Sequence, residues 1–187
     1  MTATLPEIDP HLPMGELLAI YPGAQRALFR KYHVGGCSSC GFAPTETLAQ
    51  IAARNVQMDL PEVLAYLRTS QEEDRANQIT PREVQGRRED DDAADSVHLL
   101  DIRTREEFDA VHVAGSEHFT QELMNTILMR WPRETGLIVL IDHQGARSLD
   151  AAAYFAGHGF TNVRALLGGI DAWSQEVDPS LPRYTLE

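Results

Sequence analysis

The sequence predicts a small all-α domain over residues 13–69, a linker over 70–78, and an α/β domain over 79–187 with a parallel sheet and helices on both faces. Three observations lead to this division. Apolar residues recur at helical spacing in the first part, the stretch 71–78 is polar and aperiodic, and short strand-like and helix-like segments alternate in the last part. Such alternation implies right-handed crossovers between parallel strands.

Four short helices are expected in the first part. The first ends before Pro22, which suits the first turn of the second helix. The third begins near Thr45, and the fourth opens with a capping box in which Glu62 follows Asp59 by three residues. Four helices of this length can bury one another, although the core that they form is small.

Helix starts and apolar runs alternate in the second part. Thr80 and Glu83 form one capping box, with Pro81 in the first turn, and Thr104 with Glu107 forms another. The run 137–141 is apolar throughout, which is typical of a parallel strand buried on both faces. The other expected strands are 97–100 and 163–166, and the other expected helices are 148–158 and 170–175.

Composition excludes several classes of function. The chain carries 16 Lys and Arg against 28 Asp and Glu, and its net charge of −12 argues against nucleic acid as a partner. Its longest apolar run is far shorter than the roughly 20 residues that a membrane span requires, so no membrane association is predicted. The acidic start of the sequence lacks the features of a secretory signal, which predicts a cytoplasmic location.

The loop 142–147, between the apolar run and the following helix, carries the most information. It consists of Asp142, His143, Gln144, Gly145, Ala146 and Arg147. A buried strand, a short glycine-containing loop and a helix N-terminus together aim several backbone N–H groups at one point. Arg147 can close this ring with a planar charged group. The sequence therefore predicts a cradle for an anion at the carboxyl end of the sheet.

Four motifs in the same order make the α/β part resemble the rhodanese family. They are 79–84, the stretch from 99–103 through 112–115, the six-residue loop 142–147, and the closing signature 168–173. The resemblance implies a sulfurtransferase fold. It also implies that Asp101 and Arg103 form a structural ion pair, and it includes Gly169 and Trp173 in the closing signature.

The first residue of the loop departs from the family's pattern. In sulfur-transferring members this residue is a cysteine that carries a persulfide, whereas Asp142 stands there in this chain. A carboxylate cannot form a persulfide, so thiosulfate sulfurtransfer by the usual mechanism is not expected. Asp142 either turns into the ring of N–H donors as a built-in anion, or faces solvent and caps the next helix. An aspartate nucleophile is a third alternative, but acidic metal-binding partners are missing nearby in the sequence.

Both cysteines, Cys37 and Cys40, form a C-x-x-C motif in the all-α part. They are interpreted as a redox-active pair that forms a reversible disulfide, as half of a metal site with His33 close by, or as small buried apolar residues. The segment also resembles a helical disulfide domain family that is associated with hybrid-cluster proteins. The matching positions are Tyr21, Pro22, Cys37, Cys40, Ala43, Glu46, Thr47 and Leu48.

Together these features predict a rhodanese-like protein without the catalytic cysteine, which binds or regulates in sulfur or redox metabolism. Its partner is expected to be an unknown protein or a small thiol or sulfur species, and no cofactor or metal is predicted. The alternative is a sulfurtransferase or thiol–disulfide enzyme. In that case Cys37 or Cys40 carries the sulfur, and the linker 70–78 allows it to reach the Arg147 pocket.

Overall fold

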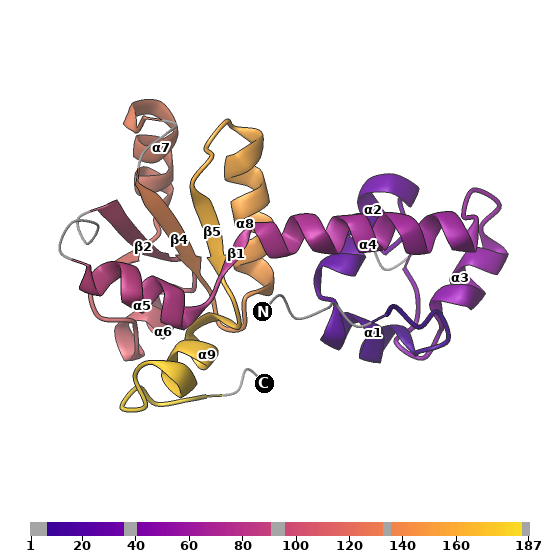
Figure 1. Cartoon of the computed structure of the whole chain (residues 1–187), viewed down its shortest axis with the longest axis horizontal. Helices are drawn as coiled ribbons and strands as arrows, with labels where there is room; N and C mark the ends of the chain where they lie inside the picture. The colour runs from indigo at the N-terminus through magenta and orange to yellow at the C-terminus, as the bar shows by residue number, and fades with distance from the viewer. Residues whose placement is uncertain (1–6, 36–40, 91–95, 133–135, 185–187) are drawn as a thin grey trace. The chain divides into compact units, whose positions relative to one another are not determined.

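The computed structural model describes residues 7–35, 41–90, 96–132 and 136–184 (Figure 1). The chain divides into two compact units, which are called unit 1 (Met1–Ala76) and unit 2 (Asn77–Glu187). Unit 1 has one hydrophobic core of its own, and unit 2 has two, one on each face of its sheet.

Unit 1 is helical, as predicted. It contains α1 (Met14–Ile20), α2 (Gly23–Tyr32), α3 (Leu48–Arg54) and α4 (Leu60–Ala76). All four helices contribute buried side chains to one core, because their apolar residues recur at helical spacing. The most deeply buried of these are Met14, Leu17, Leu28, Leu48, Ile51, Val63 and Leu67.

Two helix starts in unit 1 differ in detail from the expectation. Helix α3 begins at Leu48, after a capping box formed by Thr47 and Gln50, and so starts later than the predicted Thr45. At the start of α4, Asp59 accepts a hydrogen bond from the Glu62 backbone N–H at 3.3 Å. The Glu62 carboxylate accepts a hydrogen bond from Lys31 Nζ of α2 at 2.7 Å, so a tertiary contact uses the group that was expected to cap the helix.

The predicted linker over 70–78 is wrong. Helix α4 continues to Ala76, and the first strand of unit 2, β1 (Gln78–Ile79), begins two residues later. The intervening Asn77 already accepts a hydrogen bond from Ala165 in the sheet. The stretch is rich in Glu, Gln, Arg and Ala, which are good helix formers. Its lack of apolar periodicity indicates exposure of these helical turns, not a break in the helix.

Unit 2 is a five-stranded parallel sheet with the strand order β1-β5-β4-β2-β3. Its other strands are β2 (Val97–Asp101), β3 (Glu117–His118), β4 (Leu137–Ile141) and β5 (Val163–Leu166). Its helices are α5 (Pro81–Glu89), α6 (Arg105–Ala110), α7 (Gln121–Arg130), α8 (Ala146–Gly157) and α9 (Gly169–Glu176). The predicted α/β class with a parallel sheet is confirmed.

Strand β4 lies at the centre of the sheet and is buried on both faces, as its continuous apolar sequence predicts. Val139 and Ile141 pack in the core beneath α5 and α9, whereas Ile138 and Leu140 pack in the core beneath α7 and α8 (Figure 1). Helices therefore cover both faces. Trp173 of α9 lies in the first of these cores.

The capping boxes predicted for unit 2 are both present, at Thr80–Glu83 and at Thr104–Glu107. Hydrogen bonds from the Thr80 side chain and backbone hold the pKa of Glu83 below its usual value. Strand β3 and helix α7 were not anticipated.

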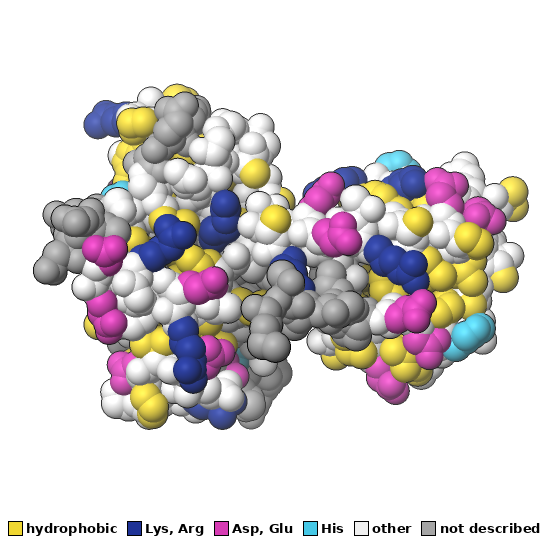
Figure 2. All heavy atoms as spheres, in the orientation of Figure 1, with side chains coloured by type: hydrophobic (Ala, Val, Ile, Leu, Met, Phe, Trp, Pro, Cys, Tyr) yellow, Lys and Arg dark blue, Asp and Glu magenta, His cyan; other side chains and the backbone are white. Residues whose placement is uncertain are grey.

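Basic and acidic side chains are interspersed on the face of the molecule shown in Figure 2. Within the described ranges, every helix is too short or too polar to cross a membrane.

Candidate functional site

The loop 142–147 joins β4 to α8 at the carboxyl end of the central strand. Its geometry depends on Gly145, which caps α8 with a φ of +94°. A Cβ atom at this position would lie 2.9 Å from the Gly168 nitrogen and 3.1 Å from the Leu166 carbonyl oxygen. Glycine therefore both permits the left-handed turn and allows the loop to approach the end of β5.

The carboxylate of Asp142 occupies the centre of this loop. Its Oδ1 accepts hydrogen bonds from the Gly145 backbone N–H at 2.6 Å and from the Ser148 hydroxyl at 3.0 Å, and its Oδ2 accepts one from the Arg147 backbone N–H at 2.8 Å. Asp142 is 2% exposed and Ser148 is fully buried. Of the two orientations left open by the sequence, the structure has the inward one.

The outer face of the loop is formed by Gln144, Ala146 and Arg147, all of which are exposed. The backbone N–H of Arg147 donates to Asp142, whereas closure of the cradle by the Arg147 side chain around a bound anion stays a prediction. Within the described part of the chain, the Arg147 guanidinium makes no hydrogen bond or ion pair. The position of Arg147 in the first turn of α8 directs its amide toward the ring.

Helix α9 holds the other side of the loop. The Asp142 carbonyl accepts a hydrogen bond from the Ile170 N–H at 2.9 Å, and the His143 carbonyl accepts one from the Asp171 N–H at 3.2 Å. These two donors belong to the first turn of α9. The closing signature and the loop are thus joined by backbone hydrogen bonds at the point where Gly169 begins the helix.

Replacing Gly169 with alanine is expected to destabilise unit 2 by about 2 kcal/mol, because Gly169 has a positive φ, a backbone conformation that is strained for residues with a Cβ atom. An added Cβ would also lie 2.5 Å from the carbonyl oxygens of Asp142 and His143. Chemical denaturation would measure the loss. The matched control is Gly86→Ala in α5, where no atom lies within 4 Å of an added Cβ. This control is expected to be neutral or stabilising by up to about 1 kcal/mol, and equal losses in both variants would contradict the prediction.

A buried ion pair lies near the loop, at the end of β2. Arg103 donates to both carboxylate oxygens of Asp101, at 2.6 Å from Nη2 and 2.9 Å from Nε, and both side chains are fully buried. Arg103 also donates to the Val111 carbonyl at 2.7 Å and to the Tyr184 hydroxyl at 2.7 Å. Burial alone would lower the pKa of Arg103, but the bonds to Asp101 and Tyr184 outweigh it and raise the pKa.

Two residues of the site were not anticipated from the sequence. Ser148 supplies one of the three donors to Asp142, and a serine in the first turn of the helix that follows the loop was the available signal. The ring of Tyr184 packs on the ring of His143, with the centroids 4.4 Å apart, and nothing in the local sequence indicated this contact. Cys37 and Cys40 lie outside the described residues.

Comparison with known proteins identifies the class to which this fold and loop belong. The family described as the rhodanese-like domain matches residues 80–176, which lie within unit 2. The chain belongs to the rhodanese-like domain family.

Relatives of the chain include sulfurtransferases. It is 33% identical over 108 residues to the probable adenylyltransferase/sulfurtransferase MoeZ of Mycobacterium tuberculosis, covering 57% of this chain but only 26% of MoeZ. It is 33% identical over 95 residues to the thiosulfate sulfurtransferase GlpE of Ectopseudomonas mendocina, covering 51% of this chain and 82% of GlpE. The human single-domain sulfurtransferase TSTD1 aligns in structure with a TM-score of 0.46 at 19% identity, covering 54% of this chain and 96% of TSTD1.

Proposed function

We propose that unit 2 is a rhodanese-like domain that does not transfer sulfur, and that it serves as a binding or regulatory module in sulfur or redox metabolism. The observation that carries this proposal is the position of the Asp142 carboxylate, which accepts hydrogen bonds from Gly145, Arg147 and Ser148 at 2.6–3.0 Å. By resemblance, the sulfur-carrying cysteine of active members stands at this position of the loop. Asp142 thus supplies the negative charge that a thiolate or persulfide would otherwise bring.

The chemistry of a carboxylate supports the absence of sulfur transfer. In rhodanese chemistry a thiolate attacks the outer sulfur of thiosulfate, sulfite leaves, and a persulfide remains on the enzyme. A carboxylate oxygen is a weak nucleophile toward sulfur and forms no stable equivalent of the persulfide. Two backbone N–H groups and one hydroxyl already donate to the Asp142 carboxylate. A thiosulfate anion would have to compete with this carboxylate, which is part of the chain, for the same three donors.

A binding role is supported by the outer face of the loop. Gln144, Ala146 and Arg147 are exposed there, and the Arg147 guanidinium has a full set of donors available to an anionic group of a partner. The partner class remains as the sequence suggests, namely a protein or a small thiol or sulfur species. The sulfurtransferase relatives support a connection to sulfur metabolism.

The proposal is tested by assaying thiosulfate:cyanide sulfurtransfer in the wild type and in the Asp142→Cys variant. The wild type is expected to show no turnover above background. The variant places a thiolate among preorganised donors and is expected to exceed background by about 100-fold or more, the scale that such donors contribute. Asp142→Ser is the matched control, because a serine side chain is similar in size to the cysteine of the first variant but carries no nucleophilic sulfur. Its turnover should remain at background.

A Cys37→Ser/Cys40→Ser double variant separates the proposal from its alternative. Wild-type turnover that disappears in the double variant would favour Cys37 or Cys40 as the sulfur carrier, and turnover that survives it would contradict both. The flexible tether that this alternative assumed is a helix as far as Ala76. Detection of a persulfide on the purified protein by mass spectrometry provides a second readout.

A further inference from the structure

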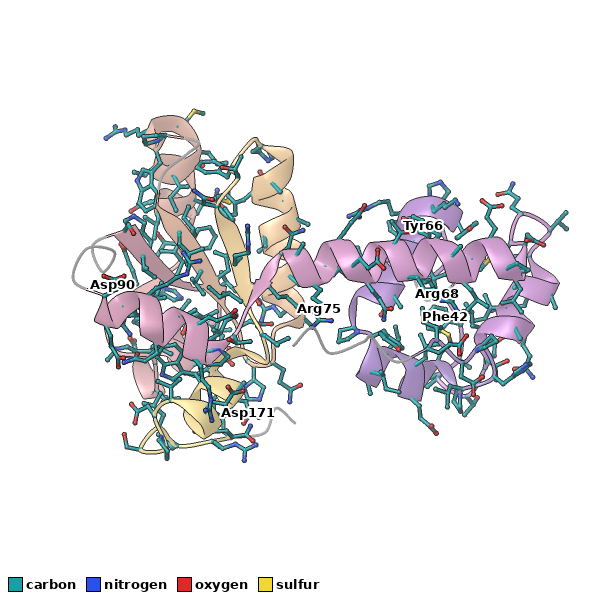
Figure 3. The ribbon with its side chains drawn as sticks, in the orientation of Figure 1. Phe42, Tyr66, Arg68, Arg75, Asp90 and Asp171 are labelled. Atoms are coloured by element: carbon teal, nitrogen blue, oxygen red, sulfur yellow. The ribbon has the colours of Figure 1, made fainter. Side chains whose placement is uncertain are left out.

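The chain that follows α9 turns back along the helix in unit 2 (Figure 1). We call residues 177–184 of this segment the strap. The Ser174 hydroxyl of α9 donates to the Leu181 carbonyl at 2.8 Å. The Arg183 guanidinium bonds both carboxylate oxygens of Asp171, at 2.7 and 3.0 Å; Asp171 is labelled on α9 in Figure 3. This ion pair holds the pKa of Asp171 below its usual value.

Tyr184 fastens the far end of the strap. Its hydroxyl accepts a hydrogen bond from Arg103 Nη1 at 2.7 Å and donates one to Glu107 Oε1 at 2.9 Å. Burial raises the pKa of Tyr184, so the hydroxyl keeps its proton at neutral pH. The strap therefore connects α9 with Arg103, which follows β2, and with Glu107 of α6.

The strap covers the one imidazole of the loop. The ring of Tyr184 lies at 53° to the ring of His143 with the centroids 4.4 Å apart, and His143 is only 8% exposed. The Nδ1 atom of His143 is buried without a hydrogen-bond partner among the described residues. The side of His143 that faces Tyr184 is closed to solvent for as long as the strap is in place.

The contacts of the strap are of a kind that can open locally. The Arg183 side chain of the ion pair with Asp171 is 56% exposed, and exposed pairs contribute little to stability. If Tyr184 leaves, Arg103 keeps its bonds to Asp101 and to the Val111 carbonyl, so no buried charge loses its partner. Val177, Leu181 and Tyr184 of the strap also pack against the core beneath α5 and α9, so opening the strap costs this apolar burial as well as the ion pair, and still less than unfolding the whole unit.

We infer that the strap is a displaceable cover on the His143 side of the loop 142–147, which buries the imidazole and must open before a partner can reach it, whereas the outer face formed by Gln144, Ala146 and Arg147 is accessible with the strap in place. The inference rests on the proposed function only in taking this loop as the binding site. The covering itself is a property of Tyr184, Arg183 and His143, and it is tested without any sulfur chemistry.

The test measures how fast diethyl pyrocarbonate modifies individual histidines, by peptide mass spectrometry of the full-length protein. Wild-type His143 is expected to react slowly. In Tyr184→Ala its rate should rise by about tenfold, toward that of the exposed His158, because local opening exposes the ring. Tyr184→Phe keeps the ring but loses both hydrogen bonds, and Arg183→Ala releases only the ion pair. Each of these milder changes should raise the rate of His143 modification by a smaller factor. Both variants can still be measured if Tyr184→Ala does not fold.

The matched control is Tyr154→Ala in α8. Tyr154 also packs on a histidine, His158, with the centroids 4.3 Å apart, but both of these residues are exposed. This variant should change the His158 rate less than twofold and leave His143 unchanged. The inference is overturned if wild-type His143 reacts as fast as His158, or if its rate is the same in the wild type and in all three strap variants. Sulfurtransfer by the wild type would refute the proposed function and leave the strap result intact.

Discussion

Replacing Asp142 with alanine is expected to lower the free energy of unfolding of unit 2 by about 3 kcal/mol, because each buried donor left without an acceptor costs about 1–3 kcal/mol. The variant removes the acceptor shared by the Gly145 and Arg147 amides and the Ser148 hydroxyl. Ser148 retains the Gly145 carbonyl as an acceptor at 3.2 Å, which limits the loss. Urea denaturation, monitored by circular dichroism, measures the change.

Two further substitutions divide this effect. Ser148→Ala removes one donor and leaves both amide bonds to Asp142, so it should cost about 1 kcal/mol, the usual net contribution of a hydrogen bond. Asp142→Asn keeps one accepting oxygen and turns its NH₂ group toward a donor, and it should fall between the serine and aspartate truncations. A wild-type-like Asp142→Ala variant would show that the carboxylate does not support the loop.

Replacing Arg103 with alanine is expected to destabilise unit 2 by about 3–5 kcal/mol, the cost of removing one partner from a buried ion pair. Asp101 would remain fully buried with its charge uncompensated, and the Val111 carbonyl and Tyr184 hydroxyl would each lose a donor. Arg103→Lys is not a conservative change here, since one ammonium cannot reproduce a planar group that donates to three residues. Thermal and chemical unfolding would both report the loss.

Arg105→Ala is the matched control for Arg103. Arg105 forms an ion pair with Asp109 one turn further along α6 at 2.8 Å, but both side chains are more than half exposed. Its removal should cost less than about 0.5 kcal/mol, because solvent screens exposed pairs of this kind. If Arg103→Ala and Arg105→Ala lowered the free energy of unfolding by similar amounts, burial would not be the reason why the Arg103–Asp101 pair matters for stability.

Local chemistry made much of the fold of unit 2 predictable from sequence. Thr80 and Thr104 each precede a glutamate by three residues, and both capping boxes form as expected. The uninterrupted apolar run became β4, the strand at the centre of the sheet. In each case the residues that form the sequence pattern are the same residues that form the capping box or the strand. The prediction therefore does not depend on contacts with distant parts of the chain.

The missed elements depend on tertiary context. Strand β3 has two residues and is defined only by its pairing with Leu100 and Asp101 of β2, which local sequence cannot reveal. The end of α4 has the sequence of a linker because its exposed helical turns carry no apolar pattern. Helix α7, by contrast, has local signals in the sequence: Thr120 is a typical capping residue, and the apolar Leu123 and Ile127 are one turn apart.

The candidate site was predictable in part. The position of the loop and the direction of its amides follow from a strand, a glycine and a helix start, all of which are recognisable in the sequence. The orientation of Asp142 depends on whether buried donors of the loop or water molecules bind its carboxylate more favourably. The sequence alone does not decide between these two orientations. The cover over His143 comes from Tyr184, a residue distant in sequence whose hydroxyl is fixed by Arg103 and Glu107.

The central claim, that the Asp142 carboxylate fills the anion cradle, is tested most directly by thermal unfolding of the wild type and of Asp142→Ala in increasing thiosulfate, with sodium chloride at matched ionic strength. An anion that binds only the folded state raises its stability by mass action. We expect thiosulfate to raise the unfolding midpoint of Asp142→Ala, because the amides that lose the carboxylate can donate hydrogen bonds to the anion, and to leave the wild type at its chloride value. Equal stabilisation of both proteins would contradict the claim, since it would mean that the wild-type cradle is open.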